Sequence, residues 1–168
     1  MDKELIKGLI AEYQQCVKSV SFAKRAVTLS DNFNYVFVGL RRVGKSYLMY
    51  QQIHHLIETG ISPEEILFFN FEDERIAGMD TEHLDMIKRC YEEMYSHRPI
   101  FFLDEIQIVP HWEQFVRRLA DQKYRVYVTG SNAKMLSKDI ATTLGGRFMI
   151  QYVYPFSFRE YLSSNGVQ

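Results

Sequence analysis

Cysteine is scarce in this chain. Cys16 and Cys90 are the two cysteines among 168 residues, and both fall in segments with helical spacing. Two distant cysteines provide no disulfide framework, so we expect both to be small buried residues in a reducing compartment. The five histidines show no zinc-type spacing with either cysteine, which argues against a structural zinc site.

Long hydrophobic runs and an excess of one charge are also missing. No apolar run approaches the roughly 18 residues that cross a bilayer, and the first residues lack a signal-peptide pattern. We therefore expect a cytoplasmic protein without membrane contact. The formal net charge is −1, and local basic groups are pairs such as Arg41-Arg42 and Arg117-Arg118, not larger patches. The charge thus gives no support for nucleic acid as a partner, although it leaves one open.

The chain has enough apolar material for one domain, with 46% hydrophobic and 14% aromatic residues. Apolar residues recur at helical spacing in four segments, at residues 4–20, 45–59, 81–95 and 111–121. Short apolar runs, each read as a strand, lie at residues 35–38, 66–71, 100–103, 124–128 and 148–154. Ser157 and Glu160 have the spacing of a capping box that opens a last helix.

The alternation of runs and helices predicts the fold class. Strands that are apolar on both faces are typical of a parallel sheet buried between two helix layers. We therefore predict an α/β three-layer sandwich with five strands, whose ligand site lies at the carboxyl ends of the strands. Residues 1–30 are expected to form an amino-terminal helix and a linker, and residues 31–168 the core.

A phosphate-binding loop is the clearest motif. Residues 39–46 read Gly-Leu-Arg-Arg-Val-Gly-Lys-Ser, after a predicted strand and before a predicted helix. Glycines let the backbone curl around an anion, and the helix amino terminus adds its dipole. Lys45 is predicted to reach the β- and γ-phosphates, and the Ser46 hydroxyl to coordinate magnesium. The predicted nucleotide-binding residues are Gly39, Arg41, Arg42, Val43, Gly44, Lys45, Ser46 and Tyr47.

Two carboxylates close the third apolar run. Asp104 and Glu105 follow residues 100–103 directly. An aspartate in this place suits a magnesium ion beside the phosphate loop. The adjacent glutamate can orient or deprotonate an attacking water. The alternative is that both acids merely end a strand and face solvent.

Other polar residues also follow predicted strands. Ser131 and Asn132 are candidates to contact the γ-phosphate, or to cap the next helix. Asn70 and Glu72, after the second run, are candidates to hold Glu105 in an inactive pose.

Arg147 precedes the last run. It is a candidate to neutralise transition-state charge, in its own chain or in a neighbour. An exposed turn arginine is the alternative, and Arg41 and Arg42 compete for the same role.

With these residues in hand, the chain resembles the AAA-type P-loop ATPases of bacteria and archaea, in the group whose ATPase domain precedes a carboxyl-terminal domain of unknown function. The resemblance rests on residues 39–46, Leu-Asp-Glu-Ile-Gln at 103–107, Thr-Gly-Ser-Asn at 129–132, Gly-Arg at 146–147 and Pro-Phe-Ser-Phe-Arg-Glu-Tyr-Leu at 155–162. It implies the strand order 5-1-4-3-2. It also implies catalytic roles for Glu105 as base, Lys45, Ser131 as polar sensor and Arg147 as arginine finger or sensor.

Members of that group extend well beyond 168 residues, so we expect this chain to be the amino-terminal ATPase part of a longer protein. The leading hypothesis is an ATPase that uses ATP and Mg²⁺ and drives a conformational change in an attached domain or partner, with an oligomer as one option. The alternatives are a nucleotide-gated binding module with little turnover, and the motor part of a DNA-associated ATPase. No Asn-Lys-x-Asp segment is present to read guanine.

Overall fold

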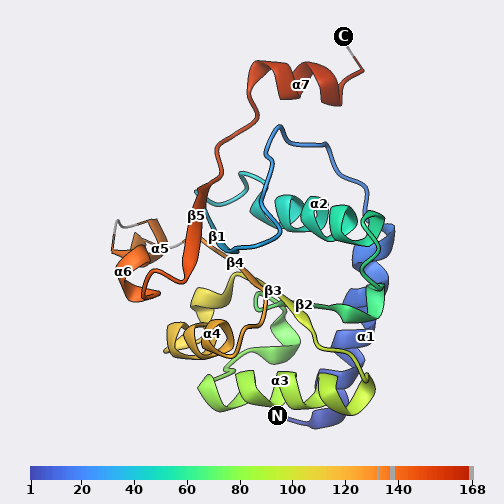
Figure 1. The fold of residues 1–168 in the computed structure, drawn as a ribbon, viewed down its shortest axis with the longest axis vertical. Helices are drawn as coiled ribbons and strands as arrows, with labels where there is room; N and C mark the ends of the chain where they lie inside the picture. The colour runs from blue at the N-terminus through green and yellow to red at the C-terminus, as the bar shows by residue number, and fades with distance from the viewer. Residues whose placement is uncertain (132, 137–138, 167–168) are drawn as a thin grey trace.

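A parallel five-stranded sheet organises the chain. The computed structural model describes residues 1–131, 133–136 and 139–166. The sheet has the strand order β2-β3-β4-β1-β5 (Figure 1), which is the predicted order read from the other edge. The strands are β1 Asn34–Val38, β2 Ile66–Asn70, β3 Ile100–Asp104, β4 Val126–Gly130 and β5 Phe148–Tyr152. The α-helices are α1 Lys3–Ser19, α2 Lys45–Glu58, α3 Thr81–Met94, α4 Trp112–Asp121, α5 Ala133–Leu136, α6 Ile140–Thr143 and α7 Phe158–Ser164. Three 3₁₀ turns complete the elements, η1 Pro63–Glu65, η2 Glu74–Ile76 and η3 Ile106–Ile108.

Helices cover both faces of the sheet, as predicted. Helix α2 lies on one face and helices α3 and α4 lie on the other (Figure 1). Helix α1 runs along the outer edge of β2, where Gln14 Nε2 donates to Ile66 O at 3.0 Å. This contact satisfies a carbonyl that an edge strand would otherwise leave unpaired.

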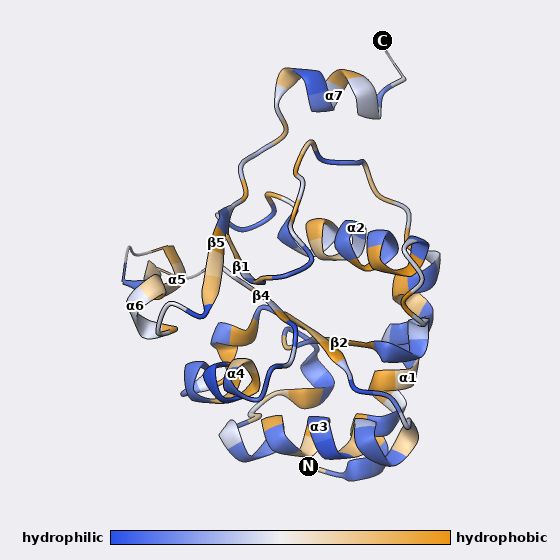
Figure 2. Cartoon of the chain, in the orientation of Figure 1, coloured by the Kyte–Doolittle hydropathy of each residue, from blue (hydrophilic) through white to orange (hydrophobic). Residues whose placement is uncertain are grey.

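The core is apolar on both sides of the strands. Every residue of β3 and β4 is buried, as are four of the five residues of β1 and of β2. Figure 2 shows hydrophobic residues along the strands, and hydrophobic and hydrophilic residues mixed along the covering helices. Trp112 opens α4 and is buried in the core.

The prediction for one cysteine was wrong. Cys90 is buried, but Cys16 is exposed. Helix α1 buries a stripe that includes Leu9, Tyr13 and Val17, and Cys16 lies outside this stripe.

The bounds of β4 and β5 differ by two residues from the prediction, and those of the other strands by one. Strand β4 begins at Val126 because Tyr124 is used at the end of α4, where its N–H donates to Leu119 O at 3.0 Å. Strand β5 ends at Tyr152 because its neighbour β1 ends at Val38 and turns into the loop. The N–H of Val153 still donates to Val38 O at 2.8 Å, which fixes the chain as it leaves the sheet.

The carboxyl-terminal segment extends from this edge. Helix α7 begins with the predicted capping box, in which the Ser157 hydroxyl accepts from Glu160 N and the Glu160 carboxylate accepts from Ser157 N. The linker between α1 and β1 approaches α7 (Figure 1). In the described ranges, no helix has the length and apolar character needed to span a membrane.

Candidate functional site

The loop between β1 and α2 lies at the carboxyl edge of the sheet. Gly44 has φ +94°, in the left-handed region that favours glycine, and α2 begins at the next residue. A Cβ on Gly39 would lie 2.4 Å from Val153 O, so only glycine fits beneath the segment that leaves β5. The loop therefore directs the amino terminus of a 14-residue helix toward the space above it.

Lys45 is folded against its own loop. Its side chain is buried, and Nζ donates to Gly39 O at 3.2 Å and to Leu40 O at 2.8 Å. The same nitrogen lies 3.6 Å from Glu105 Oε1. The ammonium is thus held at the floor of the loop by carbonyl oxygens and one carboxylate.

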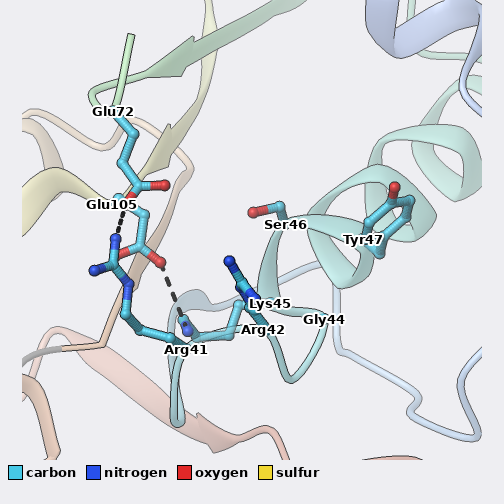
Figure 3. A pocket seen from close by; sticks show the side chains of 8 residues that line it. All are labelled: Arg41, Arg42, Gly44, Lys45, Ser46, Tyr47, Glu72 and Glu105. Atoms are coloured by element: carbon cyan, nitrogen blue, oxygen red, sulfur yellow. Dashed lines mark hydrogen bonds and ion pairs between the residues drawn. The ribbon is translucent and has the colours of Figure 1, made fainter. Parts of the chain in front are cut away.

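A cavity of about 650 Å³ opens over the loop. It is lined by Arg41, Arg42, Gly44, Lys45, Ser46, Tyr47, Glu72 and Glu105 (Figure 3). Lys45 and Glu105 point toward each other in this view, and Arg41 points toward Glu72, with which it forms an ion pair at 2.5 Å. Three cationic side chains at a helix amino terminus make this cavity suitable for a polyanion such as a nucleotide phosphate chain.

A buried threonine fixes the acidic pair at the end of β3. Thr129 Oγ1 donates to Asp104 Oδ1 at 2.6 Å and accepts from Glu105 N at 2.8 Å. Parallel pairing of β3 with β4 brings these residues together, since Leu103 lies opposite Val128. Both acids are buried, so the alternative of a solvent-facing pair at a strand end is wrong.

The environment of Asp104 combines burial with hydrogen bonding. Burial raises the pKa of the Asp104 carboxyl above its ordinary value, while hydrogen bonds from Thr129 and Ser46 oppose that rise. The Ser46 hydroxyl and the Asp104 carboxylate thus lie side by side. Oxygen ligands of these two types suit Mg²⁺, which keeps several waters and binds through few protein groups. Among the residues that the structure describes, no three His, Cys, Asp or Glu side chains form a group that could hold a metal ion.

Glu105 has two further partners. Its Oε2 accepts from Ser131 Oγ at 3.0 Å and from Gln107 Nε2 at 2.5 Å. Ser131 therefore lies beside the acidic pair, and its contact with a γ-phosphate stays a prediction. Asn132, the other candidate for that contact, lies outside the described residues.

The residues expected to hold Glu105 have other partners. Glu72 pairs with Arg41, and Asn70 Oδ1 accepts from the N–H of Glu72 at 3.0 Å. The Glu105 carboxylate is therefore held by Gln107 and Ser131, and not by Asn70 and Glu72 as expected.

Arg147 is not brought to this site. It precedes β5, and Phe148 pairs with Asn34 at the start of β1. Arg147 therefore lies at the amino ends of the strands, whereas the phosphate loop lies at their carboxyl ends. The two ends of a five-residue strand lie roughly 15 Å apart. There, Arg147 Nε donates to Asp121 Oδ1 at 2.5 Å. Its position excludes action on nucleotide at its own loop, and action on a neighbouring copy stays a prediction.

Arg25 is a site residue that the sequence analysis missed. Its buried guanidinium donates from Nη1 to Val43 O at 3.0 Å, from Nη2 to Tyr154 O at 2.5 Å and from Nε to Glu160 Oε1 at 3.1 Å. It also lies 4.8 Å from the centre of the Phe156 ring. The partners come from the loop, the segment after β5 and α7, and no sequence spacing connects them.

A second cavity, of about 440 Å³, lies on the other side of the loop. Its lining includes three aromatic rings, those of Phe22, Tyr47 and Phe156. It shares Arg42, Gly44 and Tyr47 with the first cavity, so the two meet at the loop.

Known proteins are similar to this chain over most of its length. A family model described as an AAA domain matches residues 31–162. An uncharacterized protein of Methanocaldococcus jannaschii is 33% identical over 162 residues, which are 95% of this chain and 35% of that protein. An uncharacterized protein of Haemophilus influenzae is 38% identical over 139 residues, which are 81% of this chain and 34% of that protein. The chain thus spans about a third of the length of these curated relatives.

A solved structure shares the fold. A DNA polymerase III gamma subunit-related protein from Thermotoga maritima superposes with a TM-score of 0.52 at 10% identity, over 93% of this chain and 49% of that chain. At this identity the likeness concerns the fold alone.

Proposed function

The chain belongs to the AAA domain family, and on this premise we propose that it binds ATP with magnesium at residues 39–46 and hydrolyses it to ADP and phosphate. The observation that carries the proposal is the meeting of two motifs in one cavity. Lys45 and Ser46 of the loop lie beside Glu105 and Asp104 of β3. Hydrolysis at a phosphate-binding loop uses a carboxylate that holds Mg²⁺ and a second group that orients the attacking water, and Asp104 and Glu105 suit these two roles.

Each residue has one task in this proposal. Lys45 leaves the loop carbonyls and binds the β- and γ-phosphates, and the loop N–H groups bind the remaining phosphate oxygens. Ser46 and Asp104 hold Mg²⁺, which when bound neutralises charge on the phosphates. Glu105 orients the attacking water and accepts its proton. Ser131 holds the Glu105 carboxylate through Oε2.

The second cavity is the proposed site for the adenine base. It adjoins the phosphate cavity at Gly44, as a nucleotide lying across the loop requires. Aromatic rings at Phe22, Tyr47 and Phe156 offer surfaces on which a purine can stack. The bound nucleotide then contacts the linker and the segment after β5 as well as the loop.

Arg25 provides a physical route for coupling to an attached domain or partner. Its guanidinium joins the carbonyl of Val43 in the loop to the carboxylate of Glu160 on α7. A nucleotide that moves the loop backbone therefore acts on α7 through one buried side chain. The chain spans about a third of the length of these relatives, so we propose this coupling for a domain or partner outside residues 1–168.

The test measures nucleotide affinity and phosphate release together. Glu105→Gln keeps the shape of the side chain and removes the base, so it should retain MgATP affinity and lose at least about a hundredfold in turnover. Glu58→Gln, on the last residue of α2, is the matched control and should leave both quantities unchanged. Tight MgATP binding without measurable turnover in the wild type would instead favour a nucleotide-gated binding module.

A further inference from the structure

We propose that Gln107 is a positioning residue that holds the Glu105 carboxylate by one oxygen and leaves the other free for the attacking water. The proposal rests on the hydrolytic function proposed above. It starts from the turn η3, which follows the acidic pair. Ile106 and Val109 are buried on this turn, and Val109 N donates to Ile106 O at 3.0 Å. Gln107 therefore projects from a fixed backbone.

The two oxygens of Glu105 have different partners. Oε2 accepts from Gln107 Nε2 at 2.5 Å and from Ser131 Oγ at 3.0 Å. Oε1 lies 3.6 Å from Lys45 Nζ, on the side of the phosphate cavity (Figure 3). Once Lys45 turns to a phosphate, Oε1 is the carboxylate oxygen that faces the nucleotide. Two donors on Oε2 then fix its direction.

The amide of Gln107 is unsatisfied on its other side. In the part of the chain that the structure describes, no group donates a hydrogen bond to Gln107 Oε1, although this oxygen is buried. It packs against the end of β4, since a Cβ on Gly130 would lie 2.7 Å from it. A flip of the amide group, which exchanges Nε2 and Oε1, would place two acceptor oxygens against each other. The Glu105 carboxylate therefore fixes the orientation of the Gln107 amide.

An unpaired buried amide oxygen destabilises a fold, so packing alone does not explain a glutamine here. Methionine has nearly the same length and volume and carries no strong polar group. If position 107 served packing alone, methionine would stabilise the fold as well as glutamine or better. Glutamine differs from methionine in that its amide N–H group can donate to Glu105, and this donor explains a glutamine whose other amide atom is unpaired within the described residues.

The experiment compares Gln107→Met with the wild type in three measurements. We expect single-turnover hydrolysis of MgATP to fall roughly ten- to hundredfold, because the base is no longer held in place. The Kd for MgATP should stay within about twofold and the Tm should be unchanged or higher. Ile108→Ala, at an exposed position on the same turn, is the control and should leave turnover unchanged. Turnover of Gln107→Met within about twofold of the wild type would overturn the proposal.

A double-mutant cycle with Glu105→Ala separates this proposal from the proposed hydrolysis. Glu105→Ala leaves the Gln107 donor without its partner, so the double variant should melt at a higher temperature than the sum of the two single Tm shifts predicts. Additive shifts would overturn the contact in solution. If the wild type binds MgATP without turnover, the hydrolytic function fails, and this cycle still decides whether Gln107 holds Glu105.

Discussion

The Lys45 ammonium and the Glu105 carboxylate face each other at the phosphate loop, with 3.6 Å between Nζ and Oε1. Both side chains are buried, and Lys45 also binds two carbonyls of its own loop. Neutral carbonyls are weaker partners for an ammonium than phosphate oxygens are. A bound phosphate chain should therefore draw Lys45 away from the carbonyls and free Glu105 Oε1.

Thr129 predicts a measurable link between the acidic pair and stability. Thr129→Val removes the hydroxyl that serves both Asp104 Oδ1 and Glu105 N, and it leaves these buried groups without that partner. We expect the free energy of unfolding to fall by about 1–3 kcal/mol in urea titrations. The exposed Thr142→Val is the control and should stay within about 0.5 kcal/mol of the wild type. Equal losses in both variants would contradict the role of Thr129.

Gly39 predicts a steric limit at the first residue of the loop. Gly39→Ala places a Cβ 2.4 Å from a backbone oxygen of Val153, so the loop or the segment after β5 must move. We expect a lower Tm and weaker MgATP binding. Gly8→Ala on α1 meets no atom within 4 Å and should instead stabilise the fold by about 0.5–1 kcal/mol. A Gly39→Ala variant with wild-type Tm and affinity would contradict this packing.

If the second cavity binds the adenine base, a substitution there should weaken the binding of nucleotides but not of ligands without a base. Phe22→Ala removes a stacking surface worth about 1–3 kcal/mol, so the Kd for MgATP should rise about tenfold or more. Binding of magnesium tripolyphosphate, which has no base, should not change. The control is Phe33→Ala, an exposed ring that lines neither cavity of the loop. Calorimetric titration measures both ligands, and equal weakening of both would refute the base site.

Glu160 predicts a pH dependence of stability. Burial raises the pKa of its carboxyl, but hydrogen bonds from Ser157 N and Ala26 N and the charge of Arg25 outweigh burial and leave the pKa below its ordinary value of 4.5. A lowered folded-state pKa stabilises the fold above the unfolded-state value, and this stabilisation is lost as pH falls through the folded-state value. The Tm difference between the wild type and Glu160→Gln should therefore shrink from pH 7 to below pH 4. A constant difference over this range would contradict the stabilising contacts of the Glu160 carboxylate with Arg25, Ala26 and Ser157.

The fold, the phosphate loop and the acidic pair could be predicted because their sequence signals are local. Residues 39–46 and the pair Asp104-Glu105 each form one continuous motif, and parallel strands bring their ends to one edge. The contacts of Arg25 with Val43, Tyr154 and Glu160 join segments up to 135 residues apart, and no periodicity encodes them. The partner of Glu105 on η3 was likewise missed.

Long-range placement also explains the two site expectations that the structure did not bring together. Glu72 was expected to contact Glu105 from strand topology alone, but it forms an ion pair with Arg41 instead. Arg147 precedes a strand rather than following one, and in a parallel sheet this places it at the edge away from the loop. That second placement was available from the sequence, because it needs only the order of Arg147 and the last apolar run.

Nucleotide binding at residues 39–46 is tested most directly by a thermal-shift titration of this chain and of Lys45→Ala with MgATP, MgADP and MgGTP. A ligand at a hundred times its Kd adds about 2.7 kcal/mol to a fold that alone binds it, or about 5–10 °C for a domain of this size. We expect such a shift with MgATP and its loss in Lys45→Ala. An absent shift with every nucleotide, or an equal shift in Lys45→Ala, would contradict nucleotide binding at this loop.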